Sequence, residues 1–417
     1  MIKIIEKIEG EAKLNFNFKD DKIDFVDIEF MSTRNIENIL KGKAAFDALV
    51  INPRVCGICG HAHLMATVQA IESCYDNLII SDKAKILREL TLNFELIQNH
   101  FKWFYLTLYP LFGKKQQILK AIYPSQLMSK AIAVIGGQYP HTSYAIVGGV
   151  ACEVTGMDLI KIEHYISETI KFVEENLVKV DSDVFFTCKD ADILYDGDLR
   201  EILEEIKSLK LLECGKSYDR FISFGENSLF KKGKSIKTKV THNISLEDVK
   251  ESQIMSLFAK NVSFKNKYYE VGPLARTMIN KTPLIMDAHK KYGDSIFSRI
   301  LARVYETSQL LVYSSELIKR LDLTQPSYIE PQKDISKLSG SGYSAVEAAR
   351  GTLIHRVELE AGIIKNYEII TPTQWNLSGG TREKHGVSQR AMIGLNDVKI
   401  AELVFKSFDV CSVCTTH

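Results

Sequence analysis

The sequence predicts a predominantly helical α+β protein in which long helices form the core and small β segments lie at the periphery. Three observations favour this class. Apolar residues recur at helical spacing over several long windows, strand-like alternation is confined to shorter stretches, and no internal repeat or low-complexity linker divides the 417 residues. A chain of this length can bury a large core. We therefore expect residues 1–417 to form a single domain.

The N-terminal region, residues 1–31, is predicted to form a β-hairpin. Apolar and polar residues alternate in AKLNFNF and in IDFVDIEF, and the polar turn KDDK lies between these two stretches. Much later in the chain, residues 220–270 are richer in strand-like and turn-like segments and are predicted to form a mixed β region. These are the small β parts of the expected fold.

The helical core is predicted over residues 35–210 and 290–417. Its longest candidate helix begins after Ser81, a suitable N-cap, and ends near Pro110. Further helices are predicted at residues 159–179, 198–210, 292–321 and 397–406. The last of these has enough apolar surface to dock on the core, so it would deliver the C-terminal tail to a fixed place.

Composition excludes several classes of function. The chain has 53 basic and 52 acidic side chains, so no net field attracts nucleic acid or an anionic membrane. No apolar run reaches the roughly 18 residues that span a bilayer, and the first residues lack the apolar core of a signal peptide. We therefore expect a cytoplasmic protein without a membrane span, which would reach a membrane or another compartment only through a partner subunit.

Four of the eight cysteines form two CxxC pairs near opposite ends of the chain. Cys56 and Cys59 lie in NPRVCGICGHAH, and Cys411 and Cys414 lie in FDVCSVCTTH. Four thiolates at two CxxC spacings can form a four-sulfur metal site. The other four cysteines are isolated and are expected to be small buried apolar residues: Cys74, Cys152, Cys188 and Cys214.

Three kinds of metal group are compatible with the two pairs. Spacing favours structural zinc, although zinc knuckles usually lie close together in sequence. An iron-sulfur cluster and nickel also accept thiolates. A closed zinc site needs no further polar groups, whereas here the pairs are followed by His63 and His417. The two histidines together favour a pocket in which the metal has open positions and can do chemistry.

Both motifs resemble those of the large subunit of nickel-iron hydrogenases. The family carries RxCGxCxxxH, matched from Arg54 to His63, and DPCxxCxxH, matched from Asp409 to His417 apart from its proline. Other segments also resemble the family, so the likeness covers the whole chain: KIEGEAKL, MSTRNIENILKGK, YEVGPLAR, AARG and TPTQWN. The resemblance implies the fold of a nickel-iron hydrogenase large subunit.

The resemblance implies a nickel-iron centre whose iron carries carbon monoxide and cyanide. All four cysteines of the pairs would bind nickel. Cys59 and Cys414 would also bridge to the iron, whereas Cys56 and Cys411 would be terminal nickel ligands. A chain ending at His417 resembles the form that family members take after removal of a C-terminal extension.

The resemblance also implies roles for residues around the metals. Arg350 and Thr373 would donate hydrogen bonds to the diatomic ligands of the iron, and His63 would lie in the same pocket. Glu37 and His417 would hold Mg²⁺ or a similar divalent ion, which suits a carboxylate ligand.

The reaction implied is the reversible heterolytic cleavage of H₂ into protons and electrons. A terminal thiolate such as Cys411, or the side chain of Arg350, would take the proton, and Glu9 would pass it outward. No further cysteine set has the spacing of an iron-sulfur motif, so the electrons would pass to an iron-sulfur small subunit. The protein is therefore expected to work as a heterodimer or a larger assembly.

The sequence departs from the family pattern at several positions near the proposed pocket. Val410 and Ala349 stand where the family has prolines, which frees two backbone N–H groups. Trp103 stands where a second histidine is usual. Leu111 stands where an aspartate normally pairs with the pocket arginine, so Arg350 is expected to lack that carboxylate partner.

Two other functions compete with a catalytic hydrogenase subunit. A hydrogen sensor would use the same metal site for signalling with low turnover, and the altered pocket is compatible with this role. A structural subunit of a redox complex would instead hold zinc or a cluster at the four cysteines. Metal content, the infrared bands of bound carbon monoxide and cyanide, and hydrogen-dependent dye reduction separate these three functions.

Overall fold

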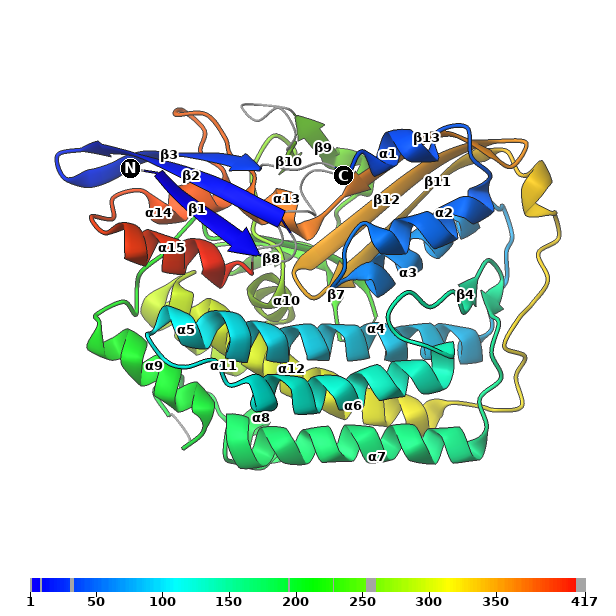
Figure 1. Cartoon of the computed structure of the whole chain (residues 1–417), viewed down its shortest axis with the longest axis horizontal. Coiled ribbons are helices and arrows are strands. Elements are labelled where there is room, and N and C mark those ends of the chain that lie inside the picture. The colour runs from blue at the N-terminus through cyan, green and yellow to red at the C-terminus, as the bar shows by residue number, and fades with distance from the viewer. Residues whose placement is uncertain are drawn as a thin grey trace.

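A computed structural model describes residues 2–7, 10–30, 34–193, 196–227, 229–252 and 260–409. Long helices form one half of the molecule, and sheets and shorter helices form the other half (Figure 1). In the part of the chain that the structure describes, no helix is both long and apolar enough to cross a membrane. The predicted class, a helix-rich α+β protein with small β parts, is confirmed.

The helical half is built from long helices that pack side by side. Four of them contact one another in pairs: α4 (Asp82–Lys102), α6 (Ile118–Gly136), α7 (Gly156–Phe172) and α12 (Ile296–Arg320). Shorter helices flank them: α5 (Tyr109–Leu111), α8 (Ser182–Thr187), α9 (Asp198–Ser208), α10 (Pro273–Asn280) and α11 (Pro283–Tyr292). Two stretches with π-helical geometry extend α4 and α7, at Trp103–Leu108 and Val173–Leu177.

The predicted helix after Ser81 is confirmed as α4, and its start has a local cause. The Ser81 hydroxyl accepts the N–H of Ala84 at 3.1 Å, which is the expected N-cap contact. Helix α6, in contrast, was not predicted. It carries Pro124 in its interior, and apolar residues also occupy its exposed face: Ile118, Leu119, Ile122 and Tyr123. Because both faces are apolar, no amphipathic pattern marks this helix in the sequence.

The predicted N-terminal hairpin is confirmed, and the structure adds a third strand to it. Strands β1 (Ile2–Lys7), β2 (Gly10–Lys19) and β3 (Lys22–Phe30) form an antiparallel sheet in that order. Asp20 and Asp21 in the β2–β3 turn both have positive φ, 50° and 58°, as a two-residue type I′ hairpin turn requires. The KDDK stretch therefore determines this turn locally.

The structure differs from the expectation over residues 340–370, inside the predicted helical core. Strands β11 (Gly340–Ala348), β12 (Gly351–Glu360) and β13 (Ile363–Ile370) form an antiparallel sheet there. Helix α3 (Gly60–Glu72) packs on β11 and β12. Since β12 is buried along most of its length, its sequence lacks the alternation of a half-exposed strand. The tight turn between β11 and β12 carries Ala349 and Arg350.

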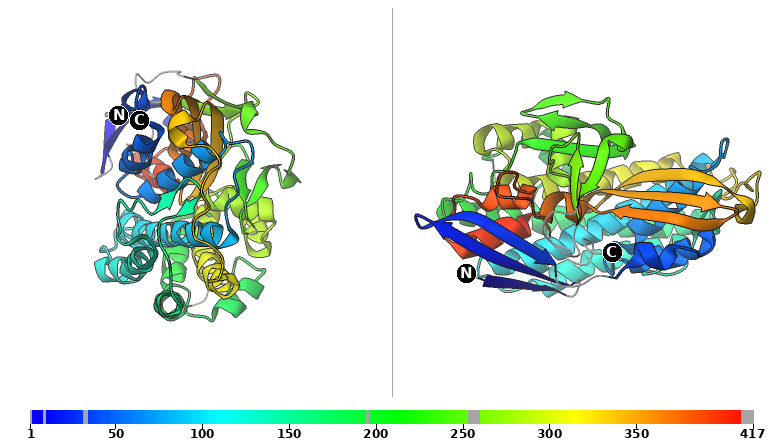
Figure 2. Two further views of the ribbon diagram at one scale, coloured as in Figure 1. Left: turned by 90° about the vertical axis from the view of Figure 1, so that its right-hand side faces the viewer. Right: turned by 90° about the horizontal axis from the view of Figure 1, so that it is seen from above.

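The predicted mixed region at residues 220–270 contains strands, as expected. They are β6 (Arg220–Glu226), β7 (Lys231–Ile236), β8 (Lys239–Thr241), β9 (Val249–Ser252) and β10 (Asn261–Phe264). A further two-stranded piece consists of β4 (Ala145–Ile146) and β5 (Gly149–Val150). Figure 2 shows the larger sheets well apart: β1–β3 at one end, β11–β13 at the other, and β6–β8 on one flank.

Short helices bring the remaining segments to the interior. They are α1 (Ile36–Leu40), α2 (Ala45–Ile51), α13 (Pro372–Leu377), α14 (Val387–Met392) and α15 (Val398–Ser407). Helix α15 confirms the helix predicted before the tail, and the side chain of Asp397 caps its start. Its apolar face is buried, so the chain leaves α15 inside the molecule at Phe408 and Asp409.

Candidate metal centre

The first cysteine pair lies in a buried loop that leads into α3. Cys56 and Cys59 are 1% and 8% exposed. The Cys56 sulfur accepts the N–H of Ile58 at 3.4 Å and that of Cys59 at 3.2 Å. Backbone N–H groups directed at sulfur stabilise the thiolate form, which is the form that binds a metal. The loop geometry is therefore compatible with the predicted metal-binding role of Cys56 and Cys59.

Gly60 makes the close approach between this loop and the preceding segment possible. A Cβ atom at Gly60 would lie 2.3 Å from the carbonyl oxygen of Pro53, a separation that real Cβ atoms do not show. At Gly57, a Cβ atom would meet nothing within 4 Å. Of the two glycines in CGICG, the second is thus required by packing.

Helix α4 holds the cysteine loop through two side chains that sequence reasoning missed. The Glu95 carboxylate accepts the N–H groups of His61 at 2.8 Å and of Ala62 at 2.9 Å, so it caps the start of α3. One turn further along α4, the Asn99 amide donates to the carbonyl of Ile58 at 3.2 Å. Complete burial raises the pKa of Glu95 to about 8. The sequence did hold one indication of this role, because Glu95 lies within the largely apolar stretch LTLNFELI and a buried charged side chain needs a partner.

The contacts of α3 with the sheet bring the cysteine loop toward the β11–β12 turn. Ser73 near the end of α3 contacts Tyr343, Ala66 contacts Ser344, and His63 near its start contacts His355. In the β11–β12 pairing, Ser344 faces His355, and the turn closes at Ala348 and Gly351. The N-terminal end of α3 is therefore the end nearer to the turn that carries Arg350.

Arg350 has no carboxylate partner at position 111, where the sequence has Leu111, but a carboxylate from another segment pairs with it. Its Nη2 lies 3.2 Å from Oδ1 of Asp409, and its Nε donates to the Asp409 carbonyl at 3.2 Å. Arg350 and Asp409 are both buried. Leu111 instead packs, half-buried, against the main hydrophobic core at the end of α5. The carboxylate thus comes from the C-terminal segment rather than from the position after Pro110.

A buried charge network continues from Asp409 into the helical core. Oδ2 of Asp409 pairs with Nη1 of Arg303 at 3.0 Å, and Arg303 Nη1 also donates to Nδ1 of His100 at 3.0 Å. The Arg303 guanidinium lies 4.6 Å from the ring centre of Trp103, whose indole N–H donates to the Lys406 carbonyl. Trp103 therefore supports both the arginine and the end of α15.

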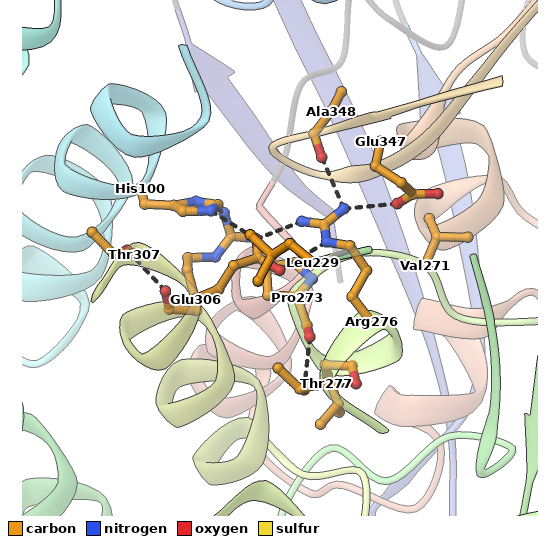
Figure 3. A network of polar contacts seen from close by, with 12 residues as sticks. His100, Leu229, Val271, Pro273, Arg276, Thr277, Glu306, Thr307, Glu347 and Ala348 are labelled. Atoms are coloured by element: carbon orange, nitrogen blue, oxygen red, sulfur yellow. Dashed lines mark hydrogen bonds and ion pairs between the residues drawn. The ribbon is translucent and has the colours of Figure 1, made fainter. Parts of the chain in front are cut away.

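The network ends in ion pairs between Arg276 and two glutamates (Figure 3). Arg276 binds Glu306 through two contacts at 2.6 and 2.7 Å, and it binds Glu347 at 2.8 Å. Burial lowers the pKa of His100 to about 4, so this histidine is neutral and donates its Nε2–H to Glu306. Burial alone would raise the pKa of Glu306, but the Arg276 guanidinium lowers it to about 2.

Thr373 lies in the first turn of α13, whose start is determined locally. Thr371 and Gln374 form a capping box, and Pro372 occupies the first helical position. The hydroxyl of Thr373 is buried and has no hydrogen-bond partner within the described residues. A buried hydroxyl in this situation suits a non-protein acceptor, such as the diatomic ligands expected at this position.

Glu37 lies in a separate polar cluster close to α13. Its Oε1 accepts the N–H of Ile369 at 2.8 Å, and its Oε2 lies 3.1 Å from Nζ of Lys260. The Lys260 ammonium also pairs with Glu251 at 3.1 Å, and Gln374 donates to the other oxygen of Glu251. Two carboxylates and one ammonium leave one unit of negative charge, which is compatible with a bound cation.

Several predicted site residues lie outside the described residues, and their placement stays a prediction. They are Glu9, Cys411, Cys414 and His417, together with the neighbouring Val410. Among the described residues, no group of three or more His, Cys, Asp and Glu side chains could hold a metal ion. Of the four predicted thiolate ligands, only Cys56 and Cys59 are among the described residues.

The fold is that of a helix-rich α+β protein, and its candidate site combines a buried cysteine loop before α3 with a buried arginine at the β11–β12 turn. The model of the nickel-dependent hydrogenase family matches residues 34–109 and 193–417. The chain belongs to this family, as the predicted resemblance indicated. It is a catalytic large subunit of the nickel-iron hydrogenase class.

Individual relatives are distant but match along the whole chain. The sulfhydrogenase 1 subunit alpha of Pyrococcus furiosus is 24% identical, over 99% of this chain and 96% of its own length. The periplasmic [NiFeSe] hydrogenase large subunit of Desulfomicrobium baculatum is 25% identical, over 99% and 93%. The solved Ni-Fe-Se hydrogenase of D. vulgaris Hildenborough has the same fold, with a TM-score of 0.84, 21% identity and complete coverage of both chains.

Proposed function

We propose that this chain cleaves and forms H₂ at a nickel-iron centre that carries carbon monoxide and cyanide on the iron. Cys56, Cys59, Cys411 and Cys414 would hold the metals. The observation that carries the proposal is the buried contact between Arg350 and Asp409. Asp409 is two residues before Cys411 in the sequence, so a second cysteine pair near this turn, which α3 also approaches, is part of the proposal.

The residues around the site fit such a centre. Two buried thiols, one of them receiving backbone N–H groups, supply a soft donor set. The Thr373 hydroxyl is a buried donor without a protein acceptor among the described residues, and the buried Arg350 guanidinium would be the second donor of the proposed pocket. When bound, the nickel-iron pair supplies the electrophilic metals that polarise H₂ and accept its electrons.

The protein's own groups would handle the proton. The ion pair with Asp409 stabilises the guanidinium form of Arg350, so this side chain is a poor proton acceptor. We therefore assign the proton to the terminal thiolate of Cys411, and its onward transfer to Glu9.

Two variants test these assignments. Cys411→Ser should abolish nickel retention. Glu9→Gln should keep the metals and slow hydrogen–deuterium exchange, and unchanged exchange would remove Glu9 from the route.

We further propose a Mg²⁺ ion or a similar divalent ion between Glu37 and His417. The net negative charge of Glu37, Glu251 and Lys260 supports a cation there. Because both Glu37 oxygens already have partners, the ion would share this carboxylate with the Lys260 ammonium.

The relatives named above are alpha or large subunits, which implies a partner subunit for this chain. We propose that the partner carries iron-sulfur clusters, since the isolated cysteines lack the spacing of a cluster motif: Cys74, Cys152, Cys188 and Cys214. In addition, no group of three or more His, Cys, Asp and Glu side chains among the described residues could hold a metal. We also propose a cytoplasmic location, where these thiols would stay reduced. One relative is named periplasmic, so cell fractionation tests this location directly.

The function is tested on the complex of this chain with its partner subunit. Nickel analysis, infrared bands of carbon monoxide and cyanide, and hydrogen-dependent dye reduction should all be positive. If the complex contains zinc instead of nickel, the hydrogenase proposal is wrong and the chain is a structural subunit. An intact centre without dye reduction would instead identify a hydrogen sensor.

A further inference from the structure

Five buried polar residues form a cluster between α3 and the β12–β13 strands. His63 Nδ1 lies 3.1 Å from His355 Nε2, and His355 Nδ1 lies 2.8 Å from the Tyr367 hydroxyl. Thr67 and Asn52 complete the cluster, and each of the five side chains is at most 1% exposed. In such a dry cluster, each hydrogen has few acceptors, so the positions of the hydrogens can be deduced from the contacts.

The hydroxyl of Thr67 has a single hydrogen, which it donates to a backbone carbonyl. Thr67 Oγ1 donates to the carbonyl of His63 at 2.7 Å, one helical turn earlier. The Asn52 amide donates to the same Oγ1 at 2.8 Å. Thr67 can therefore accept a further hydrogen from His355, which lies 3.3 Å away, but it cannot donate one.

The hydroxyl of Tyr367 then decides the tautomer of His355. Tyr367 can donate to His355 Nδ1 at 2.8 Å, or to Thr67 Oγ1 at 3.4 Å, which is long for an O–H donor. The shorter contact favours Nδ1 of His355 as the acceptor of the Tyr367 hydrogen. Because a neutral imidazole carries one hydrogen, that hydrogen is on Nε2, and it is donated to Nδ1 of His63. The hydrogen of His63 must then be on its own Nε2.

His63 follows Cys59 by four residues on α3, and its N–H bonds the Cys59 carbonyl at 3.4 Å. Residues four apart share one face of a helix, and helical side chains lean toward the N-terminus. The imidazole of His63 therefore covers the turn that carries Cys59. A thiolate near this turn is the acceptor that we consider for the second ring nitrogen of His63.

We propose that Tyr367 and His355 hold His63 in the tautomer with hydrogen on Nε2, so that His63 donates an N–H to a metal-bound thiolate. This inference rests on the proposed nickel-iron centre. A donor to a thiolate withdraws electron density from the sulfur and hence from the metals. Tyr367 and His355 are thus positioning residues that tune the centre through His63.

Tyr367→Phe in the purified complex tests this proposal. Without the hydroxyl, we expect His355 Nδ1 to donate to Thr67 Oγ1 at 3.3 Å, so that its Nε2 and then His63 Nε2 lose their hydrogens. The thiolate then loses its donor and gives more charge to the metals. We expect the infrared bands of carbon monoxide and cyanide to shift together to lower wavenumber, and the nickel potential to become more negative.

Two controls separate this effect from damage to packing. Tyr343→Phe removes an exposed hydroxyl from β11 of the same sheet and should leave the bands unchanged. Thr67→Val should lower stability, because it disturbs Asn52 and the helix, but it leaves Tyr367 donating to His355. Its bands should therefore match those of the unmodified protein.

A second pair of variants gives the same test at His355. Glutamine can place an N–H where Nε2 of His355 lies, so His355→Gln should keep the bands near their original positions. His355→Leu should shift them as Tyr367→Phe does. Unshifted bands in Tyr367→Phe and His355→Leu, with nickel retained, would overturn the tautomer proposal alone. If the unmodified complex lacks nickel or these bands, the proposed function itself fails.

Discussion

The carboxylate of Asp409 pairs with Arg303 at 3.0 Å through the oxygen that does not face Arg350. Two buried arginines therefore hold the residue that precedes the second CxxC pair by two positions. Arg303 belongs to the long helix α12, whereas Arg350 lies at a sheet turn. This contact connects the helical half of the molecule with the sheet half at the proposed metal centre.

Asp409→Asn should strongly destabilise the protein and impair metal retention. The change leaves two buried guanidinium groups without their shared carboxylate, and breaking a buried pair typically costs about 3 to 5 kcal/mol. Chemical denaturation of the complex and nickel analysis measure both effects. Asp24→Asn is the matched control, because Asp24 pairs with Arg382 on the surface and should contribute less than about 1 kcal/mol. Equal effects of the two variants would contradict the anchoring role.

Gly60→Ala should displace the cysteine loop and reduce nickel content. The added methyl group would meet the Pro53 carbonyl at 2.3 Å, and that oxygen belongs to rigid backbone. Gly57→Ala, in the same loop, adds a methyl group into open space and should retain nickel. Nickel analysis of the two variants, purified in parallel with the partner subunit, gives the comparison. Normal nickel content in Gly60→Ala would show that the loop tolerates the shift.

Glu37→Gln should lower the Mg²⁺ content of the complex while nickel is retained. The change removes a negative charge from the cluster with Lys260 and Glu251, so the cluster becomes neutral and no longer favours a cation. Elemental analysis after dialysis measures both metals. Glu29→Gln, at a half-exposed position on β3 beside Lys13, serves as the control. If the unmodified complex contains no Mg²⁺, the ion proposal fails, and the Lys260 ammonium alone would be the cation beside Glu37 and Glu251.

His100 should make the protein sensitive to mild acid. Its pKa is lowered to about 4 by burial, whereas an unfolded histidine has a pKa near its ordinary value of 6.5. The unfolded chain therefore binds a proton first, and stability is lost as the pH falls from about 6.5 toward 4. His100→Gln should flatten this part of the profile.

The midpoint of chemical unfolding, followed by circular dichroism across this pH range, measures the effect of His100→Gln. The exposed His164 on α7 offers the matched control, since His164→Gln should leave the profile unchanged. Parallel profiles for the unmodified protein and His100→Gln would show that other groups cause the acid sensitivity.

Sequence reasoning located most of the helices and the residue types of the site. It missed Glu95 and Asn99, because the sequence of an apolar helix does not show which distant residues its polar side chains contact. It noted that Leu111 removes the usual carboxylate partner of Arg350 but did not identify Asp409 as the partner, because comparing one segment with a family pattern cannot show a contact from another segment. The sheet at residues 340–370 was missed because burial on both faces hides strand alternation.

Local chemistry in the sequence by itself determined the cap at Ser81, the capping box at Thr371, the β2–β3 turn and the two CxxC donor pairs. Caps, turns and ligand spacings involve residues within a few positions of each other, so the chain encodes them directly. Only the tertiary structure decided that Asp409 meets Arg303 and Arg350, and that His63 meets His355. Such pairs depend on how helices and sheets pack. A buried charge needs an oppositely charged partner, and packing decides which distant residue supplies it.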